Sequence, residues 1–211
     1  MKQHLDLLIK RYPGLQPIKQ DILDAYLILE NCYTHHHKLL VAGNGGSAAD
    51  AGHIVGELMK GFLLQRKISS SFAKKLQAVD SELSAPLIEN LQQGLKAISL
   101  AEHSELSTAY LNDMDGSGVF AQQVFGYGDE DDVFLGISTS GNSHNVLQAA
   151  VVAKALGMKI IGLTGRNGGK LAQIADVTIQ VPETETFMVQ ELHLPIYHCL
   201  CAMLEEKFFG K

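Results

Sequence analysis

The sequence Asp132-Val133-Phe134-Leu135-Gly136-Ile137-Ser138-Thr139-Ser140-Gly141-Asn142-Ser143 joins an apolar run to a loop rich in hydroxyl groups. The run 133–137 has the length and composition of a strand that is covered on both faces. A helical pattern follows from Val146 to Ala155. Such a loop presents hydroxyls, backbone N–H groups and the positive end of a helix dipole together, which suits a phosphate. An ordinary strand-to-helix turn with Ser143 as N-cap is the simpler alternative.

A second segment repeats this design earlier in the chain. The apolar run 39–42 precedes Gly43-Asn44-Gly45-Gly46-Ser47, and a helix is predicted over 47–60 with Ser47 as its cap. The glycines permit a close approach of backbone and ligand. The loop lacks both the GxGxxG spacing and the lysine of a P-loop, so it does not indicate a nucleotide site.

Together the two loops resemble those of the sugar isomerase (SIS) domain. Within that family the sequence resembles the phosphoheptose isomerases, which interconvert sedoheptulose 7-phosphate and a heptose 7-phosphate. The resemblance extends from about Leu39 to the C-terminus and is interrupted between Phe62 and Leu95. It implies a phosphosugar isomerase that works through an enediol.

The resemblance also implies roles for individual residues. Glu57 would be the catalytic base and His198 the complementary acid. A zinc ion would be bound through His53, Glu57, Gln190 and His198. The residues implied to hold the substrate are Ser138, Thr139, Ser140 and Ser143 at the phosphate, with Asn44, Gly45, Gly46, Ser47, Asn112, Asp113 and Gln190 around the sugar.

The spacing of His53 and Glu57 supports a zinc site, whereas the spacing of Gln190 and His198 argues against it. His53 and Glu57 lie one helical turn apart, so they share a face and can reach one ion or one substrate. In isolation such a pair is more often a surface hydrogen bond, but a glycine loop directly before it favours a functional role. Gln190 and His198 are separated by about 12 Å of straight helix. They can share an ion only if the helix bends, starts late, or is joined by a second subunit.

The remaining pattern predicts an α/β fold. Strands are expected over 97–100, 159–163 and 177–181, which with the first two give a five-stranded, parallel, doubly wound sheet flanked by helices. Ligands of such sheets bind beyond the C-terminal strand ends, where both loops lie. One domain over 1–211 is expected, with N-terminal helices in 1–38. The segment 62–96 is a helical insertion that Pro86 interrupts; an oligomer contact, a lid and a spacer are all possible roles for it.

Several isolated residues are best explained structurally. The final helix, 187–209, contains Pro195 and is expected to bend there. The histidines in 35–37 point in different directions and are expected to be solvated, whereas His193 is expected to be buried beside a polar neighbour. The cysteines are odd in number and are expected to be core residues without a disulfide: Cys32, Cys199 and Cys201.

Composition excludes some classes of function. A formal net charge of −6, with 19% charged residues, argues against nucleic acid as the main partner. No run of about 18 apolar residues is present, and the N-terminus does not read as a signal peptide, so we expect a soluble, cytoplasmic protein. The resemblance implies a homo-oligomer, a tetramer with sites shared between subunits. The alternative is a non-catalytic SIS module that binds phosphosugars or serves as an oligomeric adaptor for a DNA-replication initiator.

Overall fold

A computed structural model describes residues 2–210 and contains a five-stranded parallel sheet in the order β2-β1-β3-β4-β5. Neighbouring strands pair in parallel throughout, with Leu39 opposite Val133 and Val133 opposite Lys159. The predicted doubly wound α/β fold is therefore confirmed. The strands are β1 (Leu39–Ala42), β2 (Ala97–Ser99), β3 (Val133–Ser138), β4 (Lys159–Thr164) and β5 (Val177–Gln180).

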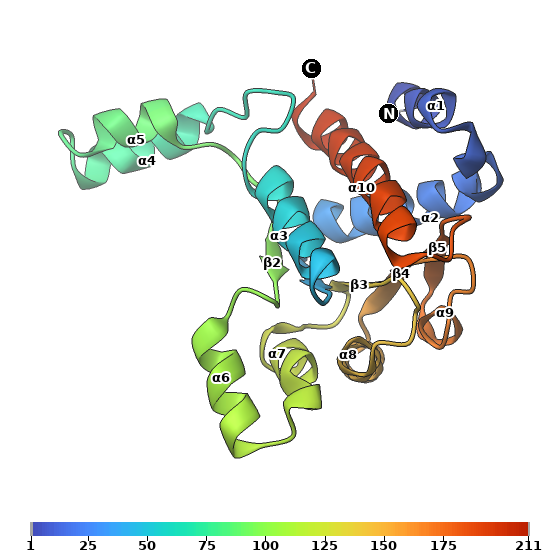
Figure 1. The fold of residues 1–211 in the computed structure, drawn as a ribbon. Coiled ribbons are helices and arrows are strands. Elements are labelled where there is room, and N and C mark those ends of the chain that lie inside the picture. The colour runs from blue at the N-terminus through green and yellow to red at the C-terminus, as the bar shows by residue number, and fades with distance from the viewer. Residues whose placement is uncertain (1, 211) are drawn as a thin grey trace.

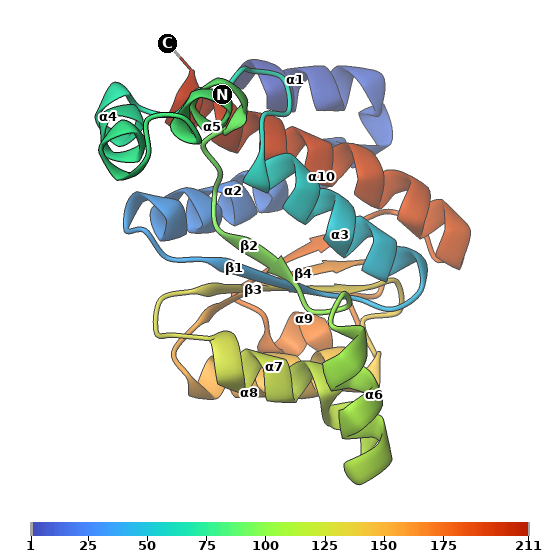
Figure 2. The same ribbon diagram turned by 90° about the vertical axis from the view of Figure 1, so that its left-hand side faces the viewer.

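Helices cover both faces of the sheet (Figures 1 and 2). Alternate residues of β1 explain the two layers: Leu39 and Val41 join one buried cluster, and Leu40 and Ala42 join the other. The first face carries α1 (Lys2–Arg11), α2 (Lys19–Thr34), α3 (Gly46–Met59) and α10 (Thr186–Phe209). The second carries α7 (Val119–Tyr127), α8 (His144–Ala155) and α9 (Leu171–Ile174), with α6 (Ser104–Asp113) at its edge.

The N-terminal helices pack on α10. A 3-10 helix, η1 (Pro13–Ile18), connects α1 to α2, which begins at Lys19, so the expected N-terminal helices in 1–38 are present. At the end of α2, His35 and His36 are exposed, as predicted, whereas His37 is half-buried with Nδ1 3.7 Å from Asp132 Oδ1. His36 has a positive φ of 64°, which ends the helix and turns the chain toward β1.

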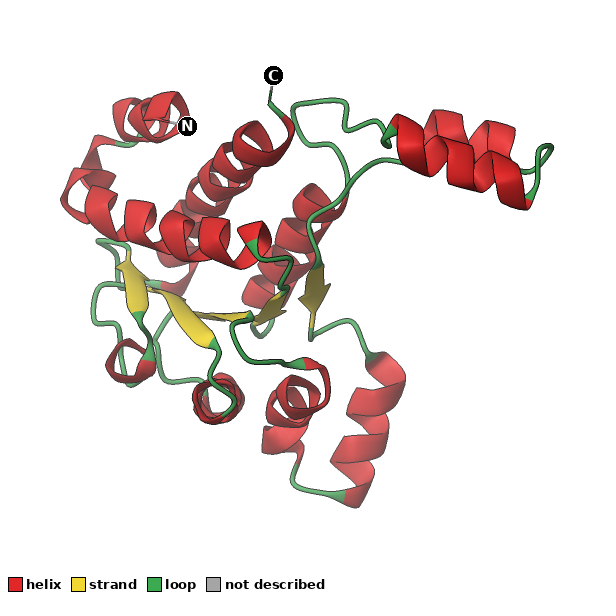
Figure 3. Ribbon diagram, turned by 180° about the vertical axis from the view of Figure 1, so that it is seen from behind, coloured by secondary structure: helices red, strands yellow, loops and turns green. Residues whose placement is uncertain are grey.

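The insertion is a helical hairpin that projects from the body of the molecule (Figures 1 and 3). It consists of α4 (Ser70–Val79) and α5 (Ser84–Asn90), and a single antiparallel bridge between Lys67 and Gln92 closes its base. The prediction that Pro86 interrupts the helix is wrong. The break lies at Asp80, whose carboxylate accepts the N–H groups of the two residues before α5, and Pro86 sits in the first turn of α5, where no helical N–H bond is needed.

The C-terminal helix α10 starts one residue before its predicted beginning and continues through Pro195 as a single element. Its inner side is buried, and Cys199 and Cys201 belong to that core, as does Cys32 of α2. All three thiols are free, in agreement with the sequence.

Among residues 2–210, no helix has both the length and the apolar character required to cross a bilayer. A further short 3-10 helix, η2 (Gly116–Gly118), leads into α7.

Candidate active site

Parallel pairing of β1 with β3 places their two loops side by side at one edge of the sheet. A reciprocal amide pair connects them: Asn44 Nδ2 donates to Asn145 Oδ1 over 2.9 Å, and Asn145 Nδ2 donates to Asn44 Oδ1 over 2.8 Å. The glycine loop is thereby tied to the first turn of α8. The two segments that the sequence singled out therefore form one surface.

The glycine loop depends on the absence of side chains at two positions. Gly45 has a positive φ of 55°, a conformation that favours glycine. A Cβ atom on Gly46 would lie 2.6 Å from Nε2 of Gln190, so the amide of Gln190 packs directly on this backbone. The prediction that Ser47 caps the helix is wrong, because α3 begins at Gly46 with Gly45 as N-cap, and the Ser47 side chain is buried.

The hydroxyl loop is held in shape by its own side chains. Ser143 occupies the N-cap position of α8, as predicted, but makes no capping bond with its side chain. Its Oγ instead lies 2.9 Å from Oγ of Ser138, which is buried. Ser140 is exposed, and its Oγ accepts the N–H of Asn142 over 3.1 Å. Because that bond uses only a lone pair, the Ser140 hydroxyl proton is free to donate to an anion.

A second group of side chains lies on the outer side of the α3–α10 layer. His53 Nε2 is 3.2 Å from Oε1 of Glu57 and 3.4 Å from Nε2 of His198. Burial lowers the pKa of His198 below its ordinary value, and the neighbouring His53 adds to this, so its imidazole is neutral at pH 7. Oε2 of Glu57 is buried and accepts no hydrogen bond, although Lys60 Nζ lies 3.5 Å away. The structure thus brings together three of the four residues expected to bind zinc.

The fourth, Gln190, belongs to the loop edge instead. Contacts follow the same order along α3 and α10: Gly46 touches Gln190, and His53 touches His198, so the helices run in the same direction. Gln190 therefore lies about 12 Å of helix away from His198. Because α10 already begins at Thr186, it does not start late, and that way of uniting Gln190 with His198 is not realised.

The donor atoms at His53 suit a metal ion only in part. Bonds of 2.0–2.1 Å to a tetrahedral zinc separate neighbouring donors by about 3.3 Å, close to both contacts of His53 Nε2. However, no group of three or more His, Cys, Asp and Glu side chains in residues 2–210 is arranged to hold a metal. The imidazoles of His53 and His198 converge as zinc ligands do, and further ligands would have to complete the site.

Asn112 and Asp113 lie away from both groups. They form the last turn of α6, which leads away from the sheet (Figure 1), and both are exposed. Among the described contacts, Asn112 Nδ2 donates to Asp113 Oδ1 over 2.8 Å, and neither side chain reaches the two loops. Within one chain the predicted sugar-binding pair is thus not assembled with the rest.

Two residues that the sequence analysis did not single out also belong to the group at His53. Tyr197 is buried, and its hydroxyl lies between His53 and Asp50. Asp50 precedes His53 by one helical turn, and this spacing could have identified it from the sequence. Tyr197 precedes His198 directly, and no spacing pattern pointed to it.

His193 is buried as predicted, with Nε2 3.3 Å from the Thr164 carbonyl, and burial lowers its pKa to about 4.

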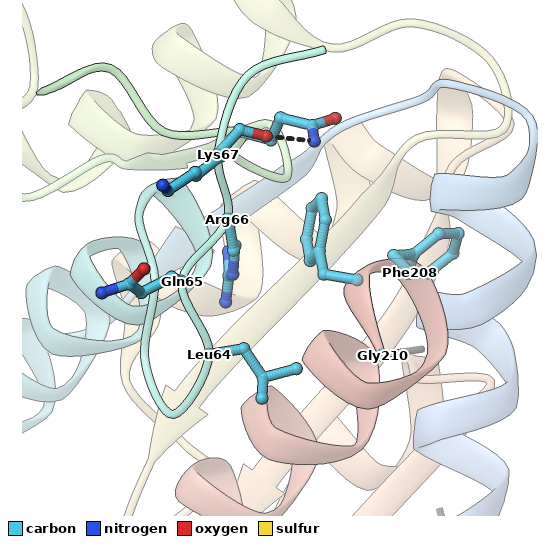
Figure 4. Close-up of a pocket in the computed structure, with 8 residues that line it drawn as sticks. Leu64, Gln65, Arg66, Lys67, Phe208 and Gly210 are labelled. Atoms are coloured by element: carbon cyan, nitrogen blue, oxygen red, sulfur yellow. Dashed lines mark hydrogen bonds between the residues drawn. The ribbon is translucent and has the colours of Figure 1, made fainter. Parts of the chain in front are cut away.

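The cavity beside His198 has a volume of about 320 Å³ and extends between α1, α10 and the loop after α3. Phe62 packs against the ring of His198, and Arg11 contributes a positive charge. A larger hollow, about 810 Å³, lies at the base of the hairpin (Figure 4). Each nitrogen of its guanidinium, Arg66, already donates to Glu205 or to a backbone carbonyl.

Comparison with known proteins identifies the family of this chain. Residues 97–203 match the SIS domain family model. The phosphoheptose isomerase of Helicobacter pylori strain P12 is 38% identical over 209 residues, which is 99% of this chain and 93% of that protein. That of Geotalea daltonii is 39% identical over 196 residues, 93% of this chain and 88% of that protein.

Solved structures show the same relationship. A phosphoheptose isomerase from Francisella tularensis superposes with a TM-score of 0.76 and one from Neisseria gonorrhoeae with 0.74. Each is 30% identical, and each alignment covers 97% of this chain and 96% of the other. The chain therefore belongs to the phosphoheptose isomerase family of SIS-domain proteins.

Proposed function

We propose that this chain is an aldose–ketose isomerase of phosphosugars that interconverts sedoheptulose 7-phosphate and a heptose 7-phosphate. The observation that carries the proposal is the meeting of the Glu57 carboxylate with the imidazoles of His53 and His198. A binding module needs no paired base and acid, whereas an isomerase must move a proton between adjacent carbons. The family relationship supports the same conclusion.

In this mechanism Glu57 removes the proton from the carbon next to the carbonyl. Its Oε2 accepts no hydrogen bond, and the nearest protein cation, Lys60 Nζ, lies 3.5 Å away. His198 gives a proton to the developing enediolate oxygen and takes it back in the reverse direction. The lowered pKa of its imidazole keeps the ring neutral near pH 7, where a neutral ring both donates and accepts.

The substrate phosphate is assigned to Ser138, Thr139, Ser140 and Ser143, at the start of α8. Hydroxyls, backbone N–H groups and the helix dipole supply the attraction there. Asn44, Gly45, Gly46, Ser47 and Gln190 line the same edge and would contact the sugar. Ser47 does not cap the helix, and Gln190 packs on Gly46 away from His198, so we assign both residues to contact with the substrate.

One chain alone does not place the phosphate loop next to the base. Gly46 and Glu57 are eleven residues apart on α3, about 16 Å of helix. We infer that the working enzyme is a homotetramer in which a second subunit completes each site, and that Asn112 and Asp113 reach the sugar from a neighbour. Because its substrates are charged sugar phosphates, we place the enzyme in the cytoplasm.

We propose zinc as the cofactor, held by His53 and His198. Glu57 would be a further ligand only at stages of the cycle in which it is not the base, and Gln190 only if a neighbouring subunit or a rearrangement brings it close. The distances of Glu57 Oε1 and His198 Nε2 from His53 Nε2, 3.2 and 3.4 Å, are close to the separation of neighbouring ligands around zinc and support this proposal. When bound, zinc would supply Lewis-acid polarisation of the substrate carbonyl.

The test is to incubate the pure protein in deuterated water with C5 to C7 ketose phosphates and to analyse products and deuterium incorporation. Glu57→Gln and His198→Asn should each lower turnover by at least ~10²-fold while phosphosugar affinity changes little. Glu89→Gln on the hairpin and His35→Asn at the end of α2 are matched exposed controls that should retain turnover.

The competing function predicts a different result. If the unmodified protein binds these ketose phosphates but exchanges no proton with any of them, with or without added zinc, the isomerase proposal is wrong. The non-catalytic SIS module, a phosphosugar sensor or an adaptor for a replication initiator, would then be the better explanation.

A further inference from the structure

The side chain of Tyr197 connects α10 to α3 at the group around His53. It is 2% exposed, and its hydroxyl is 3.1 Å from Oδ1 of Asp50 and 3.0 Å from Nδ1 of His53. The rings of Tyr197 and His53 also pack edge to face, with centroids 5.4 Å apart. His53 is therefore held from the protein side by a hydroxyl that is itself held by a carboxylate.

The direction of these hydrogen bonds follows from counting protons. A phenol has one proton to donate, and an ionised carboxylate can only accept. The ordinary pKa of a phenol is about 10, so the hydroxyl keeps its proton at neutral pH, and the geometry has it donate to Asp50. That proton goes to Asp50 Oδ1, which leaves the oxygen of Tyr197 as an acceptor. The atom facing it, Nδ1 of His53, must then carry the hydrogen.

A neutral imidazole with hydrogen on Nδ1 has a bare lone pair on Nε2. In this structure that lone pair faces Oε1 of Glu57 and Nε2 of His198. A lone pair next to a carboxylate oxygen is unfavourable unless a cation or a proton lies between them. The arrangement on the Tyr197 side therefore prepares Nε2 to bind a cation.

We propose that Tyr197, oriented by Asp50, is a positioning residue that fixes His53 in the Nδ1–H tautomer and thereby makes its Nε2 a ligand for a divalent cation of the zinc type. This inference rests on the proposed function for the identity of the cation, but the tautomer itself does not. Partners that act through a ligand's second nitrogen typically change metal affinity 10–100-fold.

The first measurement uses the metal-free, full-length protein with ¹⁵N-labelled histidine rings at about pH 8, above the ordinary imidazole pKa. The His53 signals are identified by their loss in His53→Gln. We expect a protonated Nδ1 and an unprotonated Nε2 in the unmodified protein. In Tyr197→Phe, which keeps the ring and removes only the hydroxyl, the proton should redistribute to Nε2. An Nε2–H tautomer in the unmodified protein, or no change in Tyr197→Phe, overturns the proposal.

The second measurement is zinc affinity by competition with a chromophoric chelator. Tyr197→Phe should bind zinc 10–100-fold more weakly than the unmodified protein. Tyr33→Phe is the matched control, because Tyr33 is also buried and its hydroxyl donates to the Lys96 carbonyl, outside the site. Equal affinities of the two variants overturn the metal-binding role. If the unmodified protein binds no zinc, the zinc part of the proposed function is wrong, and the ring signals alone decide the role of Tyr197.

Discussion

Glu205→Gln should destabilise the protein more than any exposed charge substitution. Glu205 and Arg66 form an ion pair whose side chains are 1% and 0% exposed, with Arg66 Nε 2.8 Å from Oε1. The carboxylate also accepts the N–H groups of Phe62 and Leu63 over 2.8 and 2.7 Å. It therefore holds the loop after α3 against α10.

The expected loss of stability follows from what the substitution leaves behind. Glutamine keeps one acceptor oxygen, but its NH₂ group faces donors, and the guanidinium of Arg66 stays buried without a counter-charge. Breaking a buried pair in this way costs about 3–5 kcal/mol. For a chain of this size that corresponds to a fall in Tm of roughly 6–20 °C. Arg66 also donates to the carbonyl of Glu57, so the last turn of α3 should loosen as well.

Urea unfolding monitored by circular dichroism, at one fixed protein concentration, is the assay. Asp6→Asn, which breaks the exposed pair with Lys19, is the control and should have a much smaller effect. Arg66→Met combined with Glu205→Gln removes both charges and should recover part of the loss. A loss below about 1 kcal/mol for Glu205→Gln would refute the reasoning.

The same pair predicts a pH dependence. Burial raises the pKa of Glu205, but the N–H groups of Phe62 and Leu63 and the charge of Arg66 outweigh it, so the net shift is downward. A depressed pKa in the folded state adds stability above the unfolded pKa, near 4.3, and that stability is lost as pH falls through the folded pKa. The difference between the unmodified protein and Glu205→Gln should therefore shrink below about pH 4.

Three further predictions concern the loops and the metal. Ser140→Ala and Ser143→Ala should each weaken phosphosugar binding by about 1 kcal/mol in calorimetric titration. Ser81→Ala on the hairpin is the matched control. Unchanged affinity in the double variant would contradict the phosphate assignment. Gly141→Ala should lower the free energy of unfolding in urea by at least ~1–2 kcal/mol, because Gly141 has a φ of 66° and a Cβ there would strike the Gly168 backbone; retained stability would contradict this. Elemental analysis of protein purified without a histidine tag should find about one zinc per chain, and absence of zinc with no response to added zinc or chelator would remove the metal from the proposal.

The local sequence was sufficient for the elements that carry their own signal. The run 133–137 is continuously apolar because β3 is covered on both faces, and that pattern identified it as a central strand. Ser143 was placed at the start of a helix by its position between a loop and an apolar periodicity, and the structure agrees. The parallel sheet followed from the alternation of strands and helices, since parallel strands need crossover helices.

Where a side chain directs its polar atoms depended on the packed structure. The Ser143 hydroxyl turns to Ser138 rather than to the helix, because the loop folds back on itself around Gly141. Pro86 looked like a break but fits the first turn of α5, since the break is set by Asp80. Such choices are decided by which partner lies within hydrogen-bond distance, and spacing along the chain does not specify this.

In the site, too, some contacts follow from local sequence and others from tertiary packing. The i,i+4 spacing of His53 and Glu57 was enough to put both on one face of α3. The addition of His198 and Tyr197 required α10 to lie alongside α3 in the same direction, an arrangement that is set by the apolar sides of both helices as they cover one face of the sheet. The same packing brings Gln190 to Gly46 and away from His198, because helix rise separates residues that the family pattern groups together. The sequence by itself thus determined the residue types and their local periodicity. The packing of distant segments decided which of these residues meet. That packing is fixed by the burial of apolar surface rather than by the polar side chains themselves.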